Sequence, residues 1–459
     1  MLNRPLILTN ITVVTPTREG KITVLPDAFV SVMDGKIEYV GQSLQKAEQS
    51  LCRIRNHEEQ GLLPSQEEEL SSSVKYEMYS GVDRLLLPTF ANGHSHIPMS
   101  ILKNSADDLK LEDWLFNVIL PRESKLLPSD IYYASLLGIA EMINGGTGAA
   151  ADMYYMSDET ARAALESGFR LNLGHFGKIE EKDAWRADPS GLAAFRKEFH
   201  LAGNGLLRVS LMVHSIYLYP DYLYPLLAKE AKEADVSIQV HVSETRTEVE
   251  NCLSKYGVSP VEALSNFGIF DRPCIAAHGV HLSDRDRDIL ASHNVTIAHN
   301  PSSNLKLASG VCDVRTLRSK GINVCIGTDG SASNNNLDMF IEMRIASLIA
   351  KERFNDPENM KAEETLFMAT RAGYIGMSFA DCGVIEAGMN ADFQVVNCDN
   401  PSMWPISDPV STLVYGTPSS AVESVMIAGR FVKYRGELTT IDFEKVKAET
   451  LSSSKRILS

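Results

Sequence analysis

The chain has 459 residues, of which 44% are hydrophobic and 22% are charged, a composition typical of globular proteins and unlike that of disordered chains. Acidic residues outnumber basic ones by 59 to 44, which gives a formal net charge of −15. Proteins that bind nucleic acid without sequence preference, or that bind anionic membranes, need a basic surface. We therefore expect neither nucleic acid nor a membrane as a partner, and a small molecule instead.

The seven cysteines are scattered along the chain, and none of them forms a CxxC pair. This pattern is typical of reduced thiols in a cytoplasmic protein. The first residues lack the cleavage pattern of a signal peptide, and no apolar run approaches the roughly 18 residues of a transmembrane helix. The sequence therefore predicts a cytoplasmic protein.

The N-terminal residues predict a small β-structure. Segments rich in β-branched residues predict strands at residues 6–15, 28–35 and 36–41. Residues 43–80 are different, because they are polar, acidic and rich in serine. They predict a solvated helix and loop inserted into this structure, and an acidic interaction tail is the alternative.

From Leu85 onward, short apolar runs alternate with stretches of helical periodicity, such as residues 130–144, 221–234 and 336–352. The eight runs lie at residues 84–96, 146–152, 170–175, 209–214, 236–241, 274–278, 295–299 and 323–329. Apolar strands that alternate with helices indicate a parallel sheet covered on both faces. Eight such units predict an α/β fold in which the sheet closes into a (β/α)₈ TIM barrel.

The pattern returns to β-structure after Gly383, with predicted strands in residues 384–396 and 421–436 and a closing helix at 443–451. We expect the two ends of the chain to pair with each other. The predicted domains are a composite β-sandwich of residues 1–86 and 384–459, with 43–80 as its acidic insertion, and a metal-dependent barrel of residues 87–383.

Titratable residues end the predicted barrel strands, where active sites of such barrels lie. They are His94, His96, Asp152, His175, His214, His241, His278, His299 and Asp329. We expect most of them to converge on one cavity at the barrel mouth. The alternative is that the histidines have only structural roles. This alternative applies better to the histidines away from strand ends, which are His57, His200 and His293.

Four of these residues form a candidate metal site. His94 and His96 lie two positions apart in an extended segment, so both imidazoles point to the same side. His241 and Asp329 would add a nitrogen and an oxygen from other strands. Three histidines and one carboxylate suit a divalent transition metal, with Zn²⁺ favoured and Fe²⁺ as the alternative.

Glu244 follows His241 by three residues and is a candidate catalytic residue. Its carboxylate could take a proton from a water that the ion acidifies and return it to a substrate nitrogen. The alternative is that Glu244 only stabilises the N-terminus of the following helix, where the helix dipole favours a negative charge. His278 would reach the attacking oxygen or the developing oxyanion, and Asp329 could orient that oxygen. This predicts hydroxide attack on an electrophilic carbon.

Several motifs carry a resemblance to a known family. They are NGHSHIPMSILKNSADDLKLEDWLFNVILPRE, VHSIYL, HVSETRTE, AAHGVHL, AHNPSSNLKLASG, GTDGSASNNNLDMFIEMR and GVIEAGMNADFQVV. With them the sequence resembles the amidohydrolase superfamily, and within it the S-adenosylhomocysteine/5′-methylthioadenosine deaminase and chlorohydrolase-like group. The resemblance implies a distorted barrel with a composite β-sandwich. It also implies His94, His96, His241 and Asp329 as metal ligands, with Glu244 and His278 catalytic.

The resemblance further implies one metal per chain. Members with two metals usually bridge them with a modified lysine at the end of the fourth strand, where this chain has His214. It implies that His214 contacts a purine-like base, that Glu123 holds ribose hydroxyls and that Trp114 walls the pocket. We expect Glu244 to contact the substrate as well.

One position departs from the group. Deaminases that accept S-adenosylhomocysteine carry an arginine after the third strand for the amino-acid carboxylate, and the matching residue here is His175. Arg186 lies in the following loop, but matches a second arginine only across a gap. Either His175 or Arg186 is a candidate contact, and the recognition of a homocysteine end stays open.

The sequence therefore predicts a metal-dependent hydrolytic deaminase that acts on an amino-substituted heterocycle, of the adenosine, 5′-methylthioadenosine or S-adenosylhomocysteine class. Metal-bound hydroxide attacks and ammonia leaves. One alternative displaces chloride or an alkylamine from a triazine-like ring, and a remote one is a catalytically silent assembly subunit. Trp114 and Glu123 favour the deaminase, and the full ligand set argues against the silent subunit. A homo-oligomer is suggested by the resemblance alone.

Overall fold

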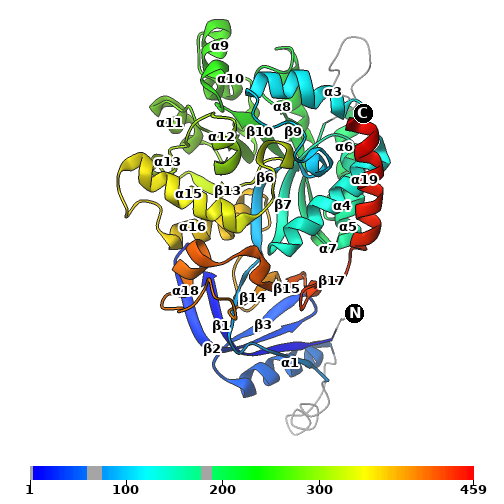
Figure 1. Cartoon of the computed structure of the whole chain (residues 1–459), viewed down its shortest axis with the longest axis vertical. Helices are drawn as coiled ribbons and strands as arrows, with labels where there is room; N and C mark the ends of the chain where they lie inside the picture. The colour runs from blue at the N-terminus through cyan, green and yellow to red at the C-terminus, as the bar shows by residue number, and fades with distance from the viewer. Residues whose placement is uncertain (1–3, 59–74, 177–188, 459) are drawn as a thin grey trace.

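Two sheets organise the chain in the computed structural model, which describes residues 4–58, 75–176 and 189–458. A parallel sheet of eight strands curls into a nearly closed barrel, and a mixed sheet of nine strands lies below it in Figure 1. No helix within the described ranges is both long and apolar enough to cross a membrane.

The barrel strands follow one another in chain order, and neighbours pair in parallel. They are β6 (Phe90–Ser95), β7 (Thr147–Met153), β8 (Arg170–His175), β9 (Leu207–Val213), β10 (Ser237–Val242), β11 (Cys274–His278), β12 (Val295–His299) and β13 (Asn323–Ile326). They are almost wholly buried because side chains fill the interior and helices cover the outside. This confirms the predicted fold class.

Close packing brings the first and last strands of the barrel together. The amide nitrogen of Asp329, just past β13, donates a hydrogen bond of 2.9 Å to the carbonyl of His94 in β6. Glycines make this approach possible, since a Cβ at Gly327 would lie 2.8 Å from the His94 nitrogen, and one at Gly93 would overlap the sulfur of Cys325. The closure therefore places two predicted metal ligands side by side.

Helices surround the barrel (Figure 1). The longer ones are α4 (Pro128–Asn144), α5 (Ser157–Ser167), α6 (Pro189–Phe199), α8 (Leu223–Glu233), α9 (Arg246–Tyr256), α10 (Pro260–Asn266), α11 (Asp284–Ser292), α15 (Met339–Phe354) and α16 (Ala362–Ala369). Shorter turns are α7 (Ala202–Gly205), η3 (Ile269–Asp271), α12 (Pro301–Lys306), α13 (Val314–Ser319), α14 (Ser331–Asn334), α17 (Arg371–Gly376), α18 (Pro409–Ser411), η4 (Thr412–Gly416) and η5 (Ser419–Ala421). The segment after β6 forms η1 (Ile97–Leu102), η2 (Asp113–Ile119) and α3 (Leu120–Glu123).

Both ends of the chain build the mixed sheet, in the order β17-β16-β15-β14-β5-β1-β2-β3 with β4 beside β1. Its strands are β1 (Leu6–Pro16), β2 (Ile22–Met33), β3 (Lys36–Gly41), β4 (Glu77–Ser80), β5 (Arg84–Pro88), β14 (Phe393–Asn397), β15 (Val422–Ile427), β16 (Arg430–Tyr434) and β17 (Glu437–Leu438). The two ends meet where β5 pairs antiparallel with β14. The expected pairing of the termini is therefore present.

Three details differ from the sequence prediction. The run 84–96 is two strands, because the chain passes from the mixed sheet (β5) into the barrel (β6) at Thr89. The segment 43–80 is only partly an insertion, since α1 (Leu44–Glu58) buries Ala47 and Leu51, and residues 77–80 pair with β1. Its acidic centre, residues 59–74, lies outside the described residues.

The closing helix, α19 (Phe443–Leu458), is longer than predicted and lies against α4 of the barrel rather than on the mixed sheet (Figure 1). Its Ile457 is fully buried, and the carbonyl of that residue accepts a hydrogen bond of 3.1 Å from Lys125. The division into domains at residues 86 and 383 stays a prediction.

Candidate active site

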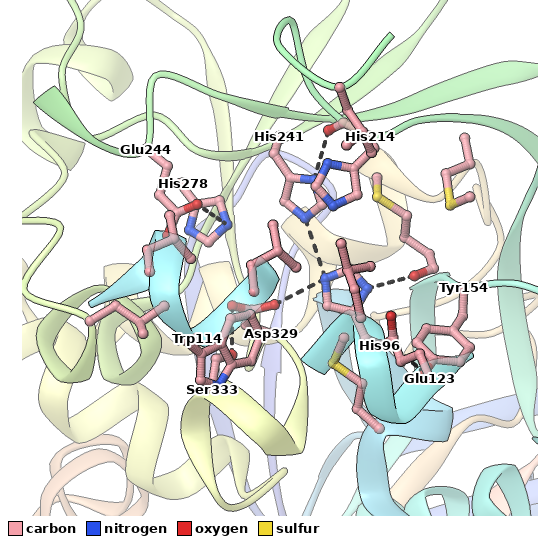
Figure 2. A pocket seen from close by; sticks show the side chains of 18 of the residues that line it. His96, Trp114, Glu123, Tyr154, His214, His241, Glu244, His278, Asp329 and Ser333 are labelled. Carbon is pink, nitrogen blue, oxygen red and sulfur yellow. Dashed lines mark hydrogen bonds and ion pairs between the residues drawn. The ribbon is translucent and has the colours of Figure 1, made fainter. Parts of the chain in front are cut away.

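Most of the predicted site residues converge on one cavity at the C-terminal ends of the barrel strands (Figure 2). His96 follows β6, His214 follows β9, His241 lies in β10, His278 ends β11 and Asp329 follows β13. The cavity is lined by His96, Met99, Leu111, Trp114, Leu115, Leu120, Glu123, Met153, Tyr154, Tyr155, Met212, His214, Tyr217, Leu218, Tyr219, His241, Glu244, His278, Leu307, Asp329 and Ser333.

Three histidines and Asp329 form a compact cluster of ligand atoms. His96 Nε2 lies 3.2 Å from Asp329 Oδ1 and 3.3 Å from His241 Nε2, and His94 Nε2 lies 3.4 Å from the same Asp329 oxygen. His94 Nε2 is buried and has no hydrogen-bond partner in the described structure. A buried nitrogen without a partner, facing other lone pairs and a carboxylate, fits a bound cation. The cluster therefore fits a divalent metal ion.

Backbone carbonyls fix the orientation of two of these rings. His96 Nδ1 donates to the carbonyl of Met153 at 2.5 Å, and His241 Nδ1 donates to the carbonyl of His214 at 2.7 Å. With the proton on Nδ1, each Nε2 presents its lone pair to the cluster, which is the arrangement usual for metal-binding histidines.

Asp329 is held in its charged form. Its Oδ2 accepts hydrogen bonds from the hydroxyls of Ser303 (2.6 Å) and Ser333 (2.9 Å), and its Oδ1 accepts one from the amide of Gly330 (2.8 Å). Burial alone would raise the pKa of Asp329, but His94 and His96 outweigh burial and hold this pKa well below its usual range. This carboxylate is therefore suited to binding a metal rather than to carrying a proton.

Glu244 lies in the opposite kind of environment. Burial raises the pKa of its carboxyl, and the neighbouring groups offset that effect only in part. Its Oε2 lies 3.7 Å from His278 Nε2, and its Oε1 accepts a hydrogen bond of 3.2 Å from Ser309. His278 is oriented in turn by Asn304, whose Oδ1 lies 2.8 Å from His278 Nδ1. Glu244 can therefore exchange a proton with a substrate beside the metal cluster.

Three residues at strand ends adopt left-handed backbone conformations that are uncommon outside glycine. The φ angles are 50° at Ser243, 75° at His278 and 61° at Asp329. Such conformations cost about 1–3 kcal/mol each and persist where surrounding contacts hold them, often in active sites. Here they turn the chain sharply at the cavity.

Glu123 lies on the other side of His96 from Glu244 and His278 (Figure 2). It accepts a hydrogen bond of 2.6 Å from the hydroxyl of Tyr154, and burial raises the pKa of Glu123 to about 7. Its basic neighbours are occupied elsewhere, because Arg122 donates to Ser105 and Lys125 donates to the carbonyl of Ile457. The Glu123 carboxylate thus faces the cavity.

Of the remaining predicted substrate contacts, two line the cavity and one that the structure describes does not. Trp114 lines the cavity, and its buried Nε1 has no hydrogen-bond partner among the described residues. His214 also lines it, and burial lowers the pKa of this imidazole to about 3, which keeps the ring neutral. His175 is not among the lining residues; its ring stacks on Phe195 at 4.0 Å. Arg186 lies outside the described residues.

Sequence patterns did not identify the residues whose hydroxyl groups donate hydrogen bonds to the carboxylates of the site. Ser303 and Ser333 donate to Asp329, and Tyr154 donates to Glu123. All three lie next to predicted strand ends, and the spacing of Ser333 four residues after Asp329 was the available signal. Serines and tyrosines are too common for such a position to single them out.

An eight-stranded barrel with this cluster at its mouth is the architecture of a metal-dependent hydrolase. The model of the amidohydrolase family matches residues 85–432. A protein of Acetivibrio thermocellus named 5-methylthioadenosine/S-adenosylhomocysteine deaminase is 41% identical over 436 residues, 95% of this chain and 96% of that protein. One of the same name from Dictyoglomus thermophilum is 40% identical over 83% of this chain and 90% of its own.

Solved structures show the same fold. An adenosine deaminase from Xanthomonas campestris with bound zinc has a TM-score of 0.85 at 31% identity and covers 98% of both chains. The atrazine chlorohydrolase TrzN from Arthrobacter aurescens TC1, complexed with zinc, has a TM-score of 0.84 at 22% identity, over 98% of this chain and 100% of its own. The second likeness shows the fold alone.

The chain belongs to the amidohydrolase family, as its motifs predict. It is an enzyme, a hydrolytic deaminase, rather than a silent assembly subunit.

Proposed function

We propose that this enzyme deaminates an adenine-type nucleoside of the adenosine, 5′-methylthioadenosine and S-adenosylhomocysteine class, with one Zn²⁺ per chain. The names of the relatives at about 40% identity support this class. The observation that carries the proposal is the layout of the cavity, with the acid–base groups Glu244 and His278 on one side of His96 and the carboxylate of Glu123 on the other. Deamination of the base requires acid–base groups, and recognition of the ribose requires an acceptor for its hydroxyls.

His94, His96, His241 and Asp329 would hold the ion, and when bound it would lower the pKa of a water and act as a Lewis acid. Zinc is favoured over iron because the adenosine deaminase at 31% identity contains it. One ion is favoured over two because His214 occupies the end of the fourth strand, where a bridging lysine is absent.

The side chains of the cavity supply the proton transfers of a hydrolytic deamination. Water adds to the ring carbon that bears the amino group, while Glu244 takes a proton from this water and delivers it to a ring nitrogen. Further transfer of protons to the amino group lets it leave as ammonia, and the ring carbon becomes a carbonyl. His278, which faces Glu244 at 3.7 Å, donates to the oxygen that gains negative charge.

The rest of the cavity would orient the nucleoside. Glu123 would accept hydrogen bonds from the two ribose hydroxyls, and the neutral His214 would contact the base. Trp114 and the aliphatic lining residues would exclude water and contact the planar ring. His175, Arg186 or both remain candidates for a homocysteine carboxylate, although His175 stacks on Phe195 in this structure.

Ammonia release by the zinc-loaded enzyme tests the proposal. The panel contains adenosine, 5′-methylthioadenosine, S-adenosylhomocysteine, free adenine, and a chlorotriazine scored for chloride. We expect the highest kcat/KM for a nucleoside. Turnover of the triazine alone, or of free adenine in preference to every nucleoside, would overturn the proposed substrate class.

We also propose that the enzyme is cytoplasmic and that it forms a homo-oligomer. The described part of the chain contains no disulfide, which fits a reducing compartment. Size measurement in solution would test the oligomer.

A further inference from the structure

A second buried glutamate lies directly behind Glu244. Glu248 is the third residue of α9 and is 6% exposed. Its Oε1 accepts a hydrogen bond of 2.9 Å from the amide of Ser243, and its Oε2 accepts one of 2.7 Å from the amide of Glu244. Its own amide donates to the hydroxyl of Thr245, the residue that caps the helix. One side chain therefore binds both peptide groups that lead from β10 to Glu244.

The peptide of Ser243 also connects to the segment that follows His278. The carbonyl of Ser243 accepts hydrogen bonds from the amides of Val280 (3.1 Å) and His281 (2.9 Å). Ser243 and His278 both have left-handed backbone conformations, with φ angles of 50° and 75°. Because such conformations need support from their surroundings, the bond from Ser243 to Glu248 stabilises the backbone on both sides of the Glu244–His278 pair.

Glu248 is not among the residues that line the cavity of the metal cluster. It borders a neighbouring cavity beside Leu111, Phe116 and Tyr217. A substrate bound at the metal cluster would therefore contact Glu244 and His278 but not Glu248.

We propose that Glu248 is a positioning residue that sets the placement of Glu244 and His278 relative to the metal cluster. A carboxylate suits this role because its two oxygens accept from two consecutive amides, which a side chain with a single acceptor oxygen cannot do. The inference rests on the proposed function only for the choice of the assay substrate.

The variant Glu248→Gln tests the proposal. Glutamine keeps the size of the side chain, but it has one acceptor oxygen, and its NH₂ group would face an amide donor. We expect kcat to fall about 10- to 100-fold, because small displacements of catalytic groups have effects of this size, while KM changes less than about threefold. The zinc content should stay at the parent value.

A matched control separates positioning from helix stability. Glu364 holds the same third position in α16 and accepts from the amide of Lys361 at 2.9 Å, but it does not line the catalytic cavity. Glu364→Gln removes a helix-capping carboxylate away from the catalytic cavity and should leave kcat unchanged. In a Glu244→Gln background, Glu248→Gln should lower kcat less than it does in the parent, because the part of its effect that acts through Glu244 is already lost.

Two kinetic results would overturn the proposal. One is a parent-like kcat in folded Glu248→Gln, and the other is an equal loss of kcat with and without Glu244. If Glu248→Gln does not fold, Glu248→Asp replaces it in the test. Aspartate is also a carboxylate but is too short to reach both amides, so a parent-like kcat in Glu248→Asp would also overturn the proposal.

Hydrogen exchange tests the contacts without any substrate. The amides of Ser243 and Glu244 should exchange at least about tenfold faster in Glu248→Gln than in Glu364→Gln, since they lose a buried acceptor. Unchanged exchange would overturn the proposal. If the parent turns over no substrate of the panel, the proposed function is overturned. The hydrogen-exchange measurement would then decide on the role of Glu248 alone.

Discussion

Asp329 and Glu244 are two carboxylates of one cavity with opposite electrostatic environments. Hydrogen bonds and two histidines keep Asp329 charged, whereas burial raises the pKa of Glu244. Pairs of groups whose pKa values are driven apart in this way commonly divide the roles of ligand and acid–base catalyst. This difference supports the proposal that Asp329 binds the metal and Glu244 transfers protons.

Glu244→Gln should keep the metal and lose activity. Glutamine preserves the shape of the side chain but cannot accept a proton, and general acid–base groups contribute about 10²–10⁴-fold in rate. Elemental analysis and kcat check the two halves of this prediction. Glu250→Gln, an exposed change on α9 six residues later, is the control and should match the parent. A rate for Glu244→Gln within a fewfold of the parent would exclude the proton-transfer role.

Glu123→Ala should affect nucleosides and spare the free base. Hydrogen bonds to a charged acceptor contribute about 1.5–3 kcal/mol each, so kcat/KM for adenosine should fall roughly tenfold to several hundredfold. The value for adenine, which has no ribose, should change little. An equal loss for both substrates would show that Glu123 supports the structure rather than the ribose.

The same residue predicts a pH dependence. Burial raises the pKa of Glu123 to about 7, so its carboxyl is protonated below that pH and is a charged acceptor above it. The preference for adenosine over adenine should therefore increase between pH 6 and 8 in the parent and stay flat in Glu123→Ala. A parent preference that does not change with pH would contradict this assignment.

At the scale of elements, apolar runs predicted seven barrel strands closely, because strands buried on both faces have few other sequence patterns. The remaining run, 84–96, was predicted as one strand, since β5 and β6 follow each other closely, are both mostly buried, and only tertiary pairing assigns them to different sheets. Site histidines were found because they end strands, whereas the hydroxyls of Ser303 and Tyr154 and the backbone contacts of Glu248 depend on packing that no local pattern encodes.

A buried ion pair joins the barrel to the C-terminal segment. Arg170 of β8 donates two hydrogen bonds, of 2.7 and 3.0 Å, to Asp392 just before β14, and their side chains are 3% and 0% exposed. Asp392→Ala should lower the free energy of unfolding by about 3–5 kcal/mol, because it leaves the Arg170 charge buried without its partner. Urea denaturation measures this value.

An exposed pair supplies the comparison. Lys229 and Glu233 form an ion pair on α8 with side chains 68% and 65% exposed, so Glu233→Ala should change the stability by less than about 0.5 kcal/mol. Equal effects of Glu233→Ala and Asp392→Ala would contradict the structural role of the buried pair.

For the whole molecule, the proposed metal ligands come from distant parts of the barrel: from β6 and the residue after it, from β10 and from the residues after β13. A ligand that binds only the folded state stabilises it by about 4 kcal/mol when its free concentration is a thousandfold above Kd. Removing the metal with a chelator should therefore lower the melting temperature, and adding Zn²⁺ should restore it. His241→Ala should melt at the same temperature with and without Zn²⁺. If Zn²⁺ raises the melting temperature of His241→Ala as much as that of the parent, the metal binds elsewhere.

The most direct test of the central claim, a mononuclear metal-dependent nucleoside deaminase, is a zinc titration of the metal-free chain with ammonia release from 5′-methylthioadenosine as the readout. The account predicts no activity without metal, a linear rise to one equivalent per chain and a plateau beyond it. Full activity in the metal-free chain, saturation only at two equivalents, or no ammonia at any ratio would contradict it.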